Sequence, residues 1–157
     1  MITHAPHITQ VLDWMASTVP GAHLYSDSRE VAARTTGDAL FMAYPGDEAD
    51  GRQYIAHAIQ AGAKAVVHEA ENFEWKKEWT VPHLAVRNLK NMAGPIAAAH
   101  YRHPDADMFT VAVTGTNGKT SCTQWLASVM SHQSDPAAVI GTLGVGVCYG
   151  SACEEHH

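Results

Sequence analysis

Two glycines, a lysine and two hydroxyl residues follow a short apolar run in the second half of the chain. The run Phe109–Val113 is typical of a strand, and Lys119 opens a pattern typical of a helix. Glycine permits positive φ angles and lets backbone N–H groups approach an anion without a Cβ in the way. The N-terminus of the following helix adds partial positive charge at the same place. The spacing therefore predicts a site for the phosphates of a nucleotide.

This pattern is a shorter form of the phosphate-binding loop, Gly-x-x-Gly-Lys-Thr, because Val113 stands where the full form has its first glycine. We expect Lys119 to bridge the β- and γ-phosphates of ATP as the catalytic residue, and the Thr120 hydroxyl to bind Mg²⁺. Ser121 is either a second phosphate ligand or simply a helix N-terminal residue. A plain strand-to-helix turn is the alternative to the whole site. The predicted ATP-binding residues are Gly115, Thr116, Asn117, Gly118, Lys119, Thr120 and Ser121.

The composition is that of a soluble globular protein, with 46% hydrophobic and 17% charged residues among 157. The net charge of −6 argues against a partner such as nucleic acid or a membrane surface, since no basic stripe could neutralise phosphates. No stretch approaches the roughly 20 apolar residues of a membrane span, and the N-terminus does not resemble a signal peptide. The three cysteines are interpreted as reduced thiols. Together these features predict a cytoplasmic protein.

Helical and strand-like patterns alternate along the chain, which predicts an α/β fold. Apolar spacing predicts helices over residues 8–18, 54–61, 89–101 and 119–130. Asn88 is the expected N-cap of the third of these helices. Short apolar runs predict strands over residues 39–44, 65–68, 84–86, 109–113 and 137–140. The charged and tryptophan-rich residues 70–80 are interpreted as a surface excursion.

We place a domain boundary near residue 88. Residues 1–88 would form a small α/β domain, and residues 89–157 would begin a nucleotide-binding domain with a parallel sheet. Such a sheet usually needs several more strand–helix units than this chain contains, so we expect the second domain to be truncated. The run Gly141–Gly146 resembles a dinucleotide loop only superficially. No helical pattern follows it, so we interpret it as a turn and connection.

The run Thr114–Thr120 resembles the ATP loop of the Mur ligases, cytoplasmic enzymes that build the peptide stem of peptidoglycan. Folylpolyglutamate synthetase carries a similar loop. The N-terminal part is more specific, because it resembles the UDP-binding domain shared by two Mur ligases. One adds the third amino acid to UDP-N-acetylmuramoyl-L-alanyl-D-glutamate, and the other adds D-alanyl-D-alanine. The residues that carry this resemblance are Asp27-Ser28-Arg29, Gly37–Phe41, Gly46, Asp50–Ile55, Ala58-Ile59 and Gly62-Ala63.

Carried over by position, the resemblance implies that Ser26 and Ser28 contact the uridine part of the substrate. The loop Asp47-Glu48-Ala49 would contact the uracil or the pyrophosphate. In relatives this loop often reads His-Gln-Ala, so two of its three side chains differ. The difference is harmless if backbone groups make the contacts, and it alters the site if side chains are needed.

Arg29 has two interpretations that the sequence does not separate. It belongs to the substrate site, or it forms a buried ion pair with Asp27 or Asp38 that only stabilises the fold.

Asn117 and the Thr-Ser pair after the lysine look more like the ligase that adds the third residue. The resemblance implies ATP-dependent activation of the D-glutamate carboxylate as an acyl phosphate, followed by attack of the amine of diaminopimelate or lysine. It also implies Mg²⁺ and a monomeric full-length enzyme, and we expect this chain not to turn over alone. The alternatives are a ligase that adds D-alanyl-D-alanine and a non-catalytic nucleotide-binding module.

Overall fold

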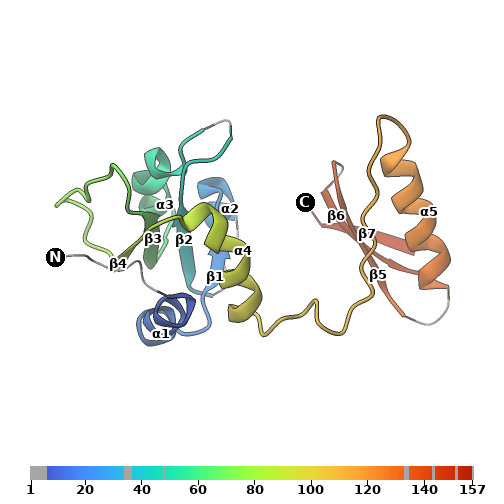
Figure 1. Ribbon diagram of the computed structural model, residues 1–157, viewed down its shortest axis with the longest axis horizontal. Coiled ribbons are helices and arrows are strands. Elements are labelled where there is room, and N and C mark those ends of the chain that lie inside the picture. The colour runs from blue at the N-terminus through green and yellow to red at the C-terminus, as the bar shows by residue number, and fades with distance from the viewer. Residues whose placement is uncertain are drawn as a thin grey trace. The chain divides into compact units, whose positions relative to one another are not determined.

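The computed structural model describes residues 7–33, 37–47, 49–132, 135–142, 144–150 and 152–156 (Figure 1). The chain divides into two compact units, one that ends at Met108 and one that begins at Phe109. The first unit contains α1 (Ile8–Thr18), β1 (His23–Tyr25), α2 (Ser28–Ala33), β2 (Ala39–Ala43), the 3₁₀ helix η1 (Gly51–Tyr54), α3 (Ile55–Gln60), β3 (Ala65–Glu69), β4 (His83–Val86) and α4 (Leu89–His100). The second unit contains α5 (Lys119–Ser131), β5 (Ala137–Gly141), β6 (Gly144–Tyr149) and β7 (Ala152–His156).

The first unit is built on a parallel four-stranded sheet in the order β1-β2-β3-β4. Successive side chains of β2 point to opposite faces, so Leu40 and Met42 join one buried cluster while Phe41 and Ala43 join another. A sheet covered on both faces needs apolar residues at consecutive positions, which explains the uninterrupted apolar run of this strand. The predicted α/β class and the predicted strands 39–44, 65–68 and 84–86 are confirmed.

Helices cover both faces of this sheet (Figure 1). On one face, Met15 of α1 and Ile96 of α4 are buried against the same side of β2 and β3. On the other face, Val31 of α2 and Ile55 of α3 are buried in a second cluster. The predicted helix over residues 8–18 matches α1, and α4 confirms the predicted helix over 89–101.

Residues 70–82 connect β3 to β4 without a helix, although the two strands are parallel. The charged residues of this segment are exposed, as the predicted surface excursion requires. Its aromatic residues, however, are half-buried against the cluster that contains Ile55, and Phe73, Trp75 and Trp79 take the place of a covering helix.

The first compact unit extends past the predicted boundary near residue 88. The reason is that Leu89 and Ile96 of α4 are both fully buried in the core of the first unit. Asn88 is the residue before α4, as predicted, but it has a left-handed backbone and its side chain does not cap the helix. The cap comes from a different residue, which is described below.

In the second unit, α5 confirms the predicted helix and β5 confirms the predicted strand 137–140. Two other expectations are wrong. The sheet is an antiparallel meander of β5, β6 and β7 rather than a parallel sheet. Only residues 142–143 separate β5 from β6, and a link of two residues joins antiparallel strands but is too short for a parallel crossover.

The predicted strand over residues 109–113 does not form in the described chain. A strand exists only where a neighbour accepts and donates its ladder hydrogen bonds, and among the described residues none pairs with this run. The run Gly141–Gly146 is indeed a turn and connection, since Gly141 and Gly144 are cross-strand partners at the end of a hairpin.

The expectation of three reduced thiols holds for Cys122, which is exposed and free, but is wrong for Cys148, which is disulfide-bonded. Among the helices that the structure describes, none has the length and apolar character needed to cross a membrane.

Candidate functional site

The predicted substrate residues of the first unit lie at one edge of its sheet. Residues 26–28 directly follow β1, and residues 44–50 directly follow β2. Both segments therefore lie at the carboxyl ends of parallel strands, where open α/β sheets bind their ligands. The structure thus brings Ser26, Ser28, Asp47 and Ala49 to the same edge of the sheet. Glu48 lies outside the described residues.

The segment after β1 is organised by Asp27. Its carboxylate accepts a hydrogen bond from the backbone N–H of Arg29 at 2.9 Å, which caps the first turn of α2. The same carboxylate pairs with the Arg29 guanidinium, Nη2 to Oδ2 at 2.5 Å. The hydrogen bonds from Arg29 hold the pKa of Asp27 below its ordinary value. Arg29 does pair with Asp27, one of the two partners considered, but its side chain is 85% exposed, so the interpretation as a buried ion pair is wrong.

The two serines differ sharply in accessibility. Ser26 is exposed, whereas Ser28 is only 5% exposed. The Ser28 hydroxyl lies 2.9 Å from Nδ1 of His57, which is an exposed residue of α3. His57 was missed by sequence reasoning, because its partner is 29 residues away and nothing in the spacing marks the pair.

The loop after β2 is closed by backbone hydrogen bonds. The N–H of Gly46 donates to the carbonyl of Ala49 at 2.8 Å, and the N–H of Gly51 donates to the carbonyl of Tyr44 at 3.0 Å. The exposed Asp47 carboxylate accepts from Nζ of Lys90 at 2.5 Å, and this contact lowers the pKa of Asp47. The loop is therefore held to the first turn of α4, a contact that the sequence did not reveal.

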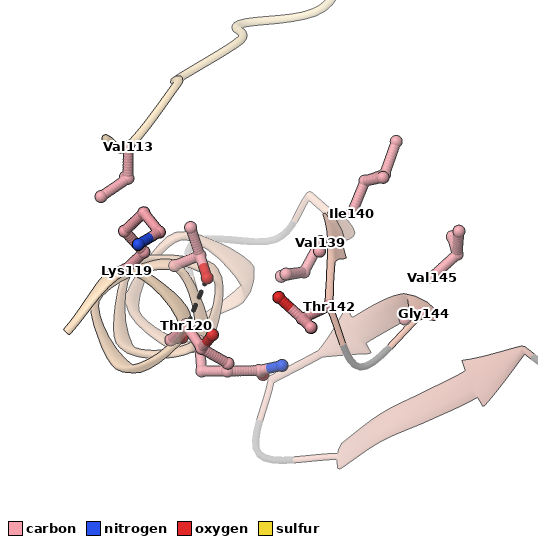
Figure 2. A pocket seen from close by; sticks show the side chains of 12 residues that line it. Val113, Lys119, Thr120, Val139, Ile140, Thr142, Gly144 and Val145 are labelled. Carbon is pink, nitrogen blue, oxygen red and sulfur yellow. Dashed lines mark hydrogen bonds between the residues drawn. The ribbon is translucent and has the colours of Figure 1, made fainter. Parts of the chain in front are cut away.

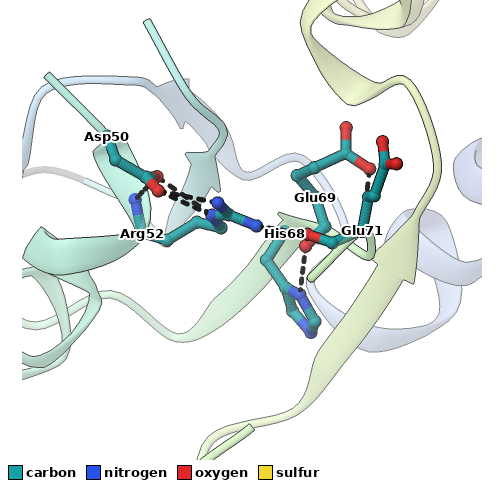
Figure 3. Close-up of polar contacts among 5 residues, drawn as sticks. All are labelled: Asp50, Arg52, His68, Glu69 and Glu71. Carbon is teal, nitrogen blue, oxygen red and sulfur yellow. Dashed lines mark hydrogen bonds and ion pairs between the residues drawn. The ribbon is translucent and has the colours of Figure 1, made fainter. Parts of the chain in front are cut away.

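A second ion pair, between Arg52 and Asp50, lies at the end of the same loop (Figure 3). Arg52 is largely buried and contacts both oxygens of Asp50, with Nε at 2.9 Å from Oδ1 and Nη2 at 2.7 Å from Oδ2. Its remaining Nη1 donates to the carbonyl of Glu71 at 2.6 Å, and its guanidinium lies over the Phe73 ring. These contacts join the loop after β2 to the segment after β3. The hydrogen bonds from Arg52 lower the pKa of Asp50, and their effect outweighs that of burial, which acts in the opposite direction.

The predicted phosphate-binding loop lies in the second unit. Gly115 has φ of 148° and Gly118 has φ of 78°, so both glycines use the positive φ that the sequence predicted. Gly118 is the N-cap of α5, and α5 begins at Lys119. Nζ of Lys119 donates to the carbonyl of Gly115 at 2.6 Å, which curls the lysine back over the loop. Thr116, Asn117, Thr120 and Ser121 are exposed around it.

A cavity of about 230 Å³ lies between the first turns of α5 and the β5–β6 hairpin (Figure 2). Its polar lining includes Lys119 and Thr120, together with Thr123 and Gln124 from the next turn of α5. The apolar lining comes from Val113 and from β5 and β6. Sequence reasoning missed Thr123 and Gln124. Their spacing of three and four residues from Thr120 places them on the same helix face, and this was the available signal.

The loop fits a phosphate group. Two positive-φ glycines, an exposed helix N-terminus and a lysine amine converge there, and the lysine now bonds a backbone carbonyl that a phosphate oxygen could replace. In the part of the chain that the structure describes, no group of three or more His, Cys, Asp or Glu residues could hold a metal ion. A magnesium ion here would rely on hydroxyl, water and phosphate oxygens, which is its usual mode of binding with nucleotides.

Comparison with known proteins agrees with both units. The sequence matches the model of the Mur ligase family catalytic domain over residues 23–101 and that of the Mur ligase middle domain over residues 113–156. Similar proteins include the UDP-N-acetylmuramoyl-L-alanyl-D-glutamate–2,6-diaminopimelate ligases of Janthinobacterium sp. (strain Marseille), Nitrosomonas europaea and Chromobacterium violaceum.

The first of these is 60% identical over 89% of this chain, the second 44% over 79% and the third 42% over 96%. The aligned parts amount to 27%, 23% and 31% of these relatives, so the chain spans less than a third of their length. Because the catalytic-domain model alone matches residues 23–101, half of this sequence, the chain belongs to the Mur ligase family.

Proposed function

We propose that this chain supplies the UDP-binding and ATP-phosphate-binding parts of a ligase that adds diaminopimelate to UDP-N-acetylmuramoyl-L-alanyl-D-glutamate. The observation that carries the proposal is the pairing of two sites in one chain. The segments at the carboxyl edge of the first sheet lie within the residues that match the catalytic-domain model, and a glycine–lysine loop with positive φ angles precedes a helix within the residues that match the middle-domain model. Diaminopimelate, rather than lysine, is favoured by the substrates named in the relatives at 42–60% identity.

The first unit holds the uridine end of the substrate. Ser26 and the closed loop around Asp47 and Ala49 are exposed at the carboxyl edge of the sheet. Backbone hydrogen bonds from Gly46 to Ala49 and from Gly51 to Tyr44 close this loop, and these bonds do not depend on which side chains the loop carries. This supports binding through the backbone, which tolerates Asp47 and Glu48 where relatives often have His and Gln.

The second unit holds the phosphates of ATP, which is a substrate of the reaction. On binding, Lys119 exchanges the Gly115 carbonyl for the β- and γ-phosphate oxygens, and backbone N–H groups at the start of α5 face the same oxygens. Mg²⁺, when bound, neutralises phosphate charge, and the Thr120 hydroxyl is the residue of this chain that would bind it.

The chemistry turns a poor electrophile into a good one. A D-glutamate carboxylate oxygen attacks the γ-phosphorus of ATP, and the bond to ADP breaks. The amine of diaminopimelate then attacks the carbonyl carbon of the acyl phosphate, loses a proton and expels phosphate as the amide forms. The contribution of this chain is positioning and charge stabilisation, with Lys119 opposite the charge that develops on the transferred phosphoryl group.

Calorimetric titration of the 157-residue chain tests the proposal. We expect saturable binding of UDP-N-acetylmuramoyl-L-alanyl-D-glutamate, and separate binding of Mg-ATP that the Lys119→Met variant weakens. Tighter binding of the dipeptide form than of the tripeptide form supports the ligase that adds the third residue. Preference for the tripeptide form would instead indicate the ligase that adds D-alanyl-D-alanine. Absence of binding to either form, by a chain with a cooperative unfolding transition, would overturn the proposal in favour of a plain nucleotide-binding module.

A further inference from the structure

The contact between Ser28 and His57 is not explained by the fold of either helix. Asp27 already caps α2 through the N–H of Arg29, so the Ser28 hydroxyl is not needed as a cap. The hydroxyl instead makes a contact of 2.9 Å to Nδ1 of His57 on α3. The residues differ in exposure, since Ser28 is 5% exposed while His57 lies at the surface. A buried hydroxyl therefore holds one nitrogen of an exposed imidazole.

Holding Nδ1 fixes the direction of the other ring nitrogen. The two nitrogens of an imidazole lie on different sides of the ring, so anchoring one of them fixes the orientation of the ring and with it the direction of the other. A ring anchored through Nδ1 to a buried group presents Nε2 away from that group. The arrangement is typical of a polar side chain whose geometry is fixed in advance for a ligand, which reduces the entropy lost on binding.

The surroundings of His57 suit the uridine end of a nucleotide. Ser28 belongs to the segment after β1, at the carboxyl edge of the sheet, and exposed Ser26 lies two residues before it. Tyr54 is 46% exposed and comes three residues before His57, a spacing that puts the two residues on the same side of the η1–α3 segment. An exposed aromatic residue and a fixed hydrogen-bonding nitrogen on one side of a segment are suited to a pyrimidine base, which can stack on the first and hydrogen-bond to the second.

We infer that Nε2 of His57 contacts the uridine end of the substrate and that Ser28 is a positioning residue that acts through His57. The inference rests on the proposed function, because it concerns the same UDP site. It changes the role that the family resemblance gave to Ser28. Ser28 is only 5% exposed and has little surface for a ligand to contact, whereas the His57 imidazole that it holds is exposed. It also makes His57 a determinant of affinity for the nucleoside.

Two conservative substitutions separate this role from a structural link between α2 and α3. The amide of asparagine reaches the position of Nδ1, so His57→Asn keeps the contact with Ser28 but has nothing at Nε2. The amide of glutamine reaches the position of Nε2, so His57→Gln keeps the group that faces the ligand. The experiment is calorimetric titration of the full chain with UDP, with the melting temperature recorded for every variant. Lys64→Ala is the control, since exposed Lys64 precedes β3 at the opposite edge of the sheet.

We expect His57→Ala and His57→Asn to weaken UDP binding at least tenfold, which corresponds to the loss of one good hydrogen bond. His57→Gln should recover part of this loss, and Ser28→Ala should weaken binding severalfold because the ring is no longer held. Lys64→Ala should bind like the unaltered chain. Wild-type affinity in His57→Asn, together with a lower melting temperature in His57→Ala and Ser28→Ala, would overturn the inference and leave a structural link.

Failure of the proposed function gives a different result. If the unaltered, folded chain binds neither UDP nor UDP-N-acetylmuramoyl-L-alanyl-D-glutamate, the UDP site itself is refuted, and the inference falls with it. If the unaltered chain binds UDP and His57→Ala binds equally well, only the role of His57 is refuted.

Discussion

The carboxylate of Glu69 accepts a hydrogen bond at 2.8 Å from the backbone N–H of Leu89, the first residue of α4. Its other oxygen accepts from the N–H groups of Glu71 and Asn88, both at 3.2 Å. A buried acidic residue at the end of β3 thus satisfies the backbone donors at the start of α4, a task that falls to the N-cap side chain in most helices. Negative charge is also favourable at a helix N-terminus.

Replacing Glu69 tests this arrangement. Glu69→Gln substitutes an NH₂ group for one of the accepting oxygens, so at least one of the backbone N–H groups that donate to the carboxylate loses its acceptor. We expect the free energy of unfolding to fall by about 1–3 kcal/mol. Urea unfolding followed by tryptophan fluorescence in a Trp125→Phe background reports on the first unit alone. Glu71→Gln is the matched control, since the Glu71 side chain is exposed, and equal losses in the two variants would contradict the account.

The histidine pair beneath residues 70–82 predicts a pH dependence of stability. His68 is 2% exposed, and its Nε2 lies 3.2 Å from Nδ1 of His83, whose ring stacks on Trp75 at 3.8 Å. Burial lowers the pKa of both histidines, so the folded state favours their neutral forms. Their contribution is complete above the ordinary histidine pKa of about 6.5 and is lost as the pH falls from there through the lowered values.

We therefore expect the free energy of unfolding of the first unit to decrease between pH 7 and pH 5. His68→Phe keeps a ring beside Phe73 and Trp75 but does not titrate, so its stability should vary less over this range. His103→Asn, a substitution of an exposed histidine, should keep the full pH dependence. Urea titrations at several pH values measure these slopes, and the same slope in His68→Phe as in the unaltered chain would refute the explanation.

The glycine that closes the predicted substrate loop has no room for a side chain. A Cβ at Gly51 would lie 2.8 Å from the carbonyl oxygen and 3.3 Å from the nitrogen of Tyr44, both of them backbone atoms that cannot rotate away. We expect Gly51→Ala to lower the free energy of unfolding by about 1–3 kcal/mol through this overpacking. Gln53→Ala, at an exposed position in the same turn, should change it by less than about 0.5 kcal/mol. Equal stability of both variants would show that the loop adapts freely.

The lysine of the phosphate loop should affect binding rather than stability. Lys119 is exposed, and its amine bonds only a loop carbonyl among the contacts described above. We expect Lys119→Met to weaken Mg-ATP binding by about tenfold to a hundredfold, as for loss of a hydrogen bond to a charged group. The melting temperature should stay unchanged. Lys77→Met, at another exposed lysine, is the control for the general loss of positive charge, and equal weakening in both variants would argue against a specific role.

Much of the first unit could be predicted from local pattern. The strand β2 is apolar at every position because both faces of its sheet are covered, and α4 shows its helical period clearly. The short strand β1 was not predicted, because its three residues give too little pattern for a period to show. The run Phe109–Val113 was predicted as a strand because it is apolar. Its composition indicates a tendency to form a strand but does not show whether a neighbouring strand is present to pair with it.

For the candidate sites too, local pattern could be predicted from the sequence, whereas contacts between distant residues could not. The phosphate loop could be proposed from the sequence because its residues are contiguous, and the structure confirms the positive φ angles of Gly115 and Gly118. The contacts Ser28–His57, Asp47–Lys90 and Glu69–Leu89 join residues 29, 43 and 20 positions apart. Only the folded sheet edge brings such pairs together, so no spacing rule could have indicated them.

The most direct test of the two-site account is a pair of ¹H–¹⁵N NMR titrations of the isotopically labelled 157-residue chain. UDP-N-acetylmuramoyl-L-alanyl-D-glutamate should shift the backbone amides of residues 26–29, 46–51 and 57, and Mg-ATP should shift those of residues 115–121. Saturating shifts confined to these two sets would support the account. Shifts in the first unit caused by Mg-ATP alone, or no shifts there with the UDP substrate, would contradict it.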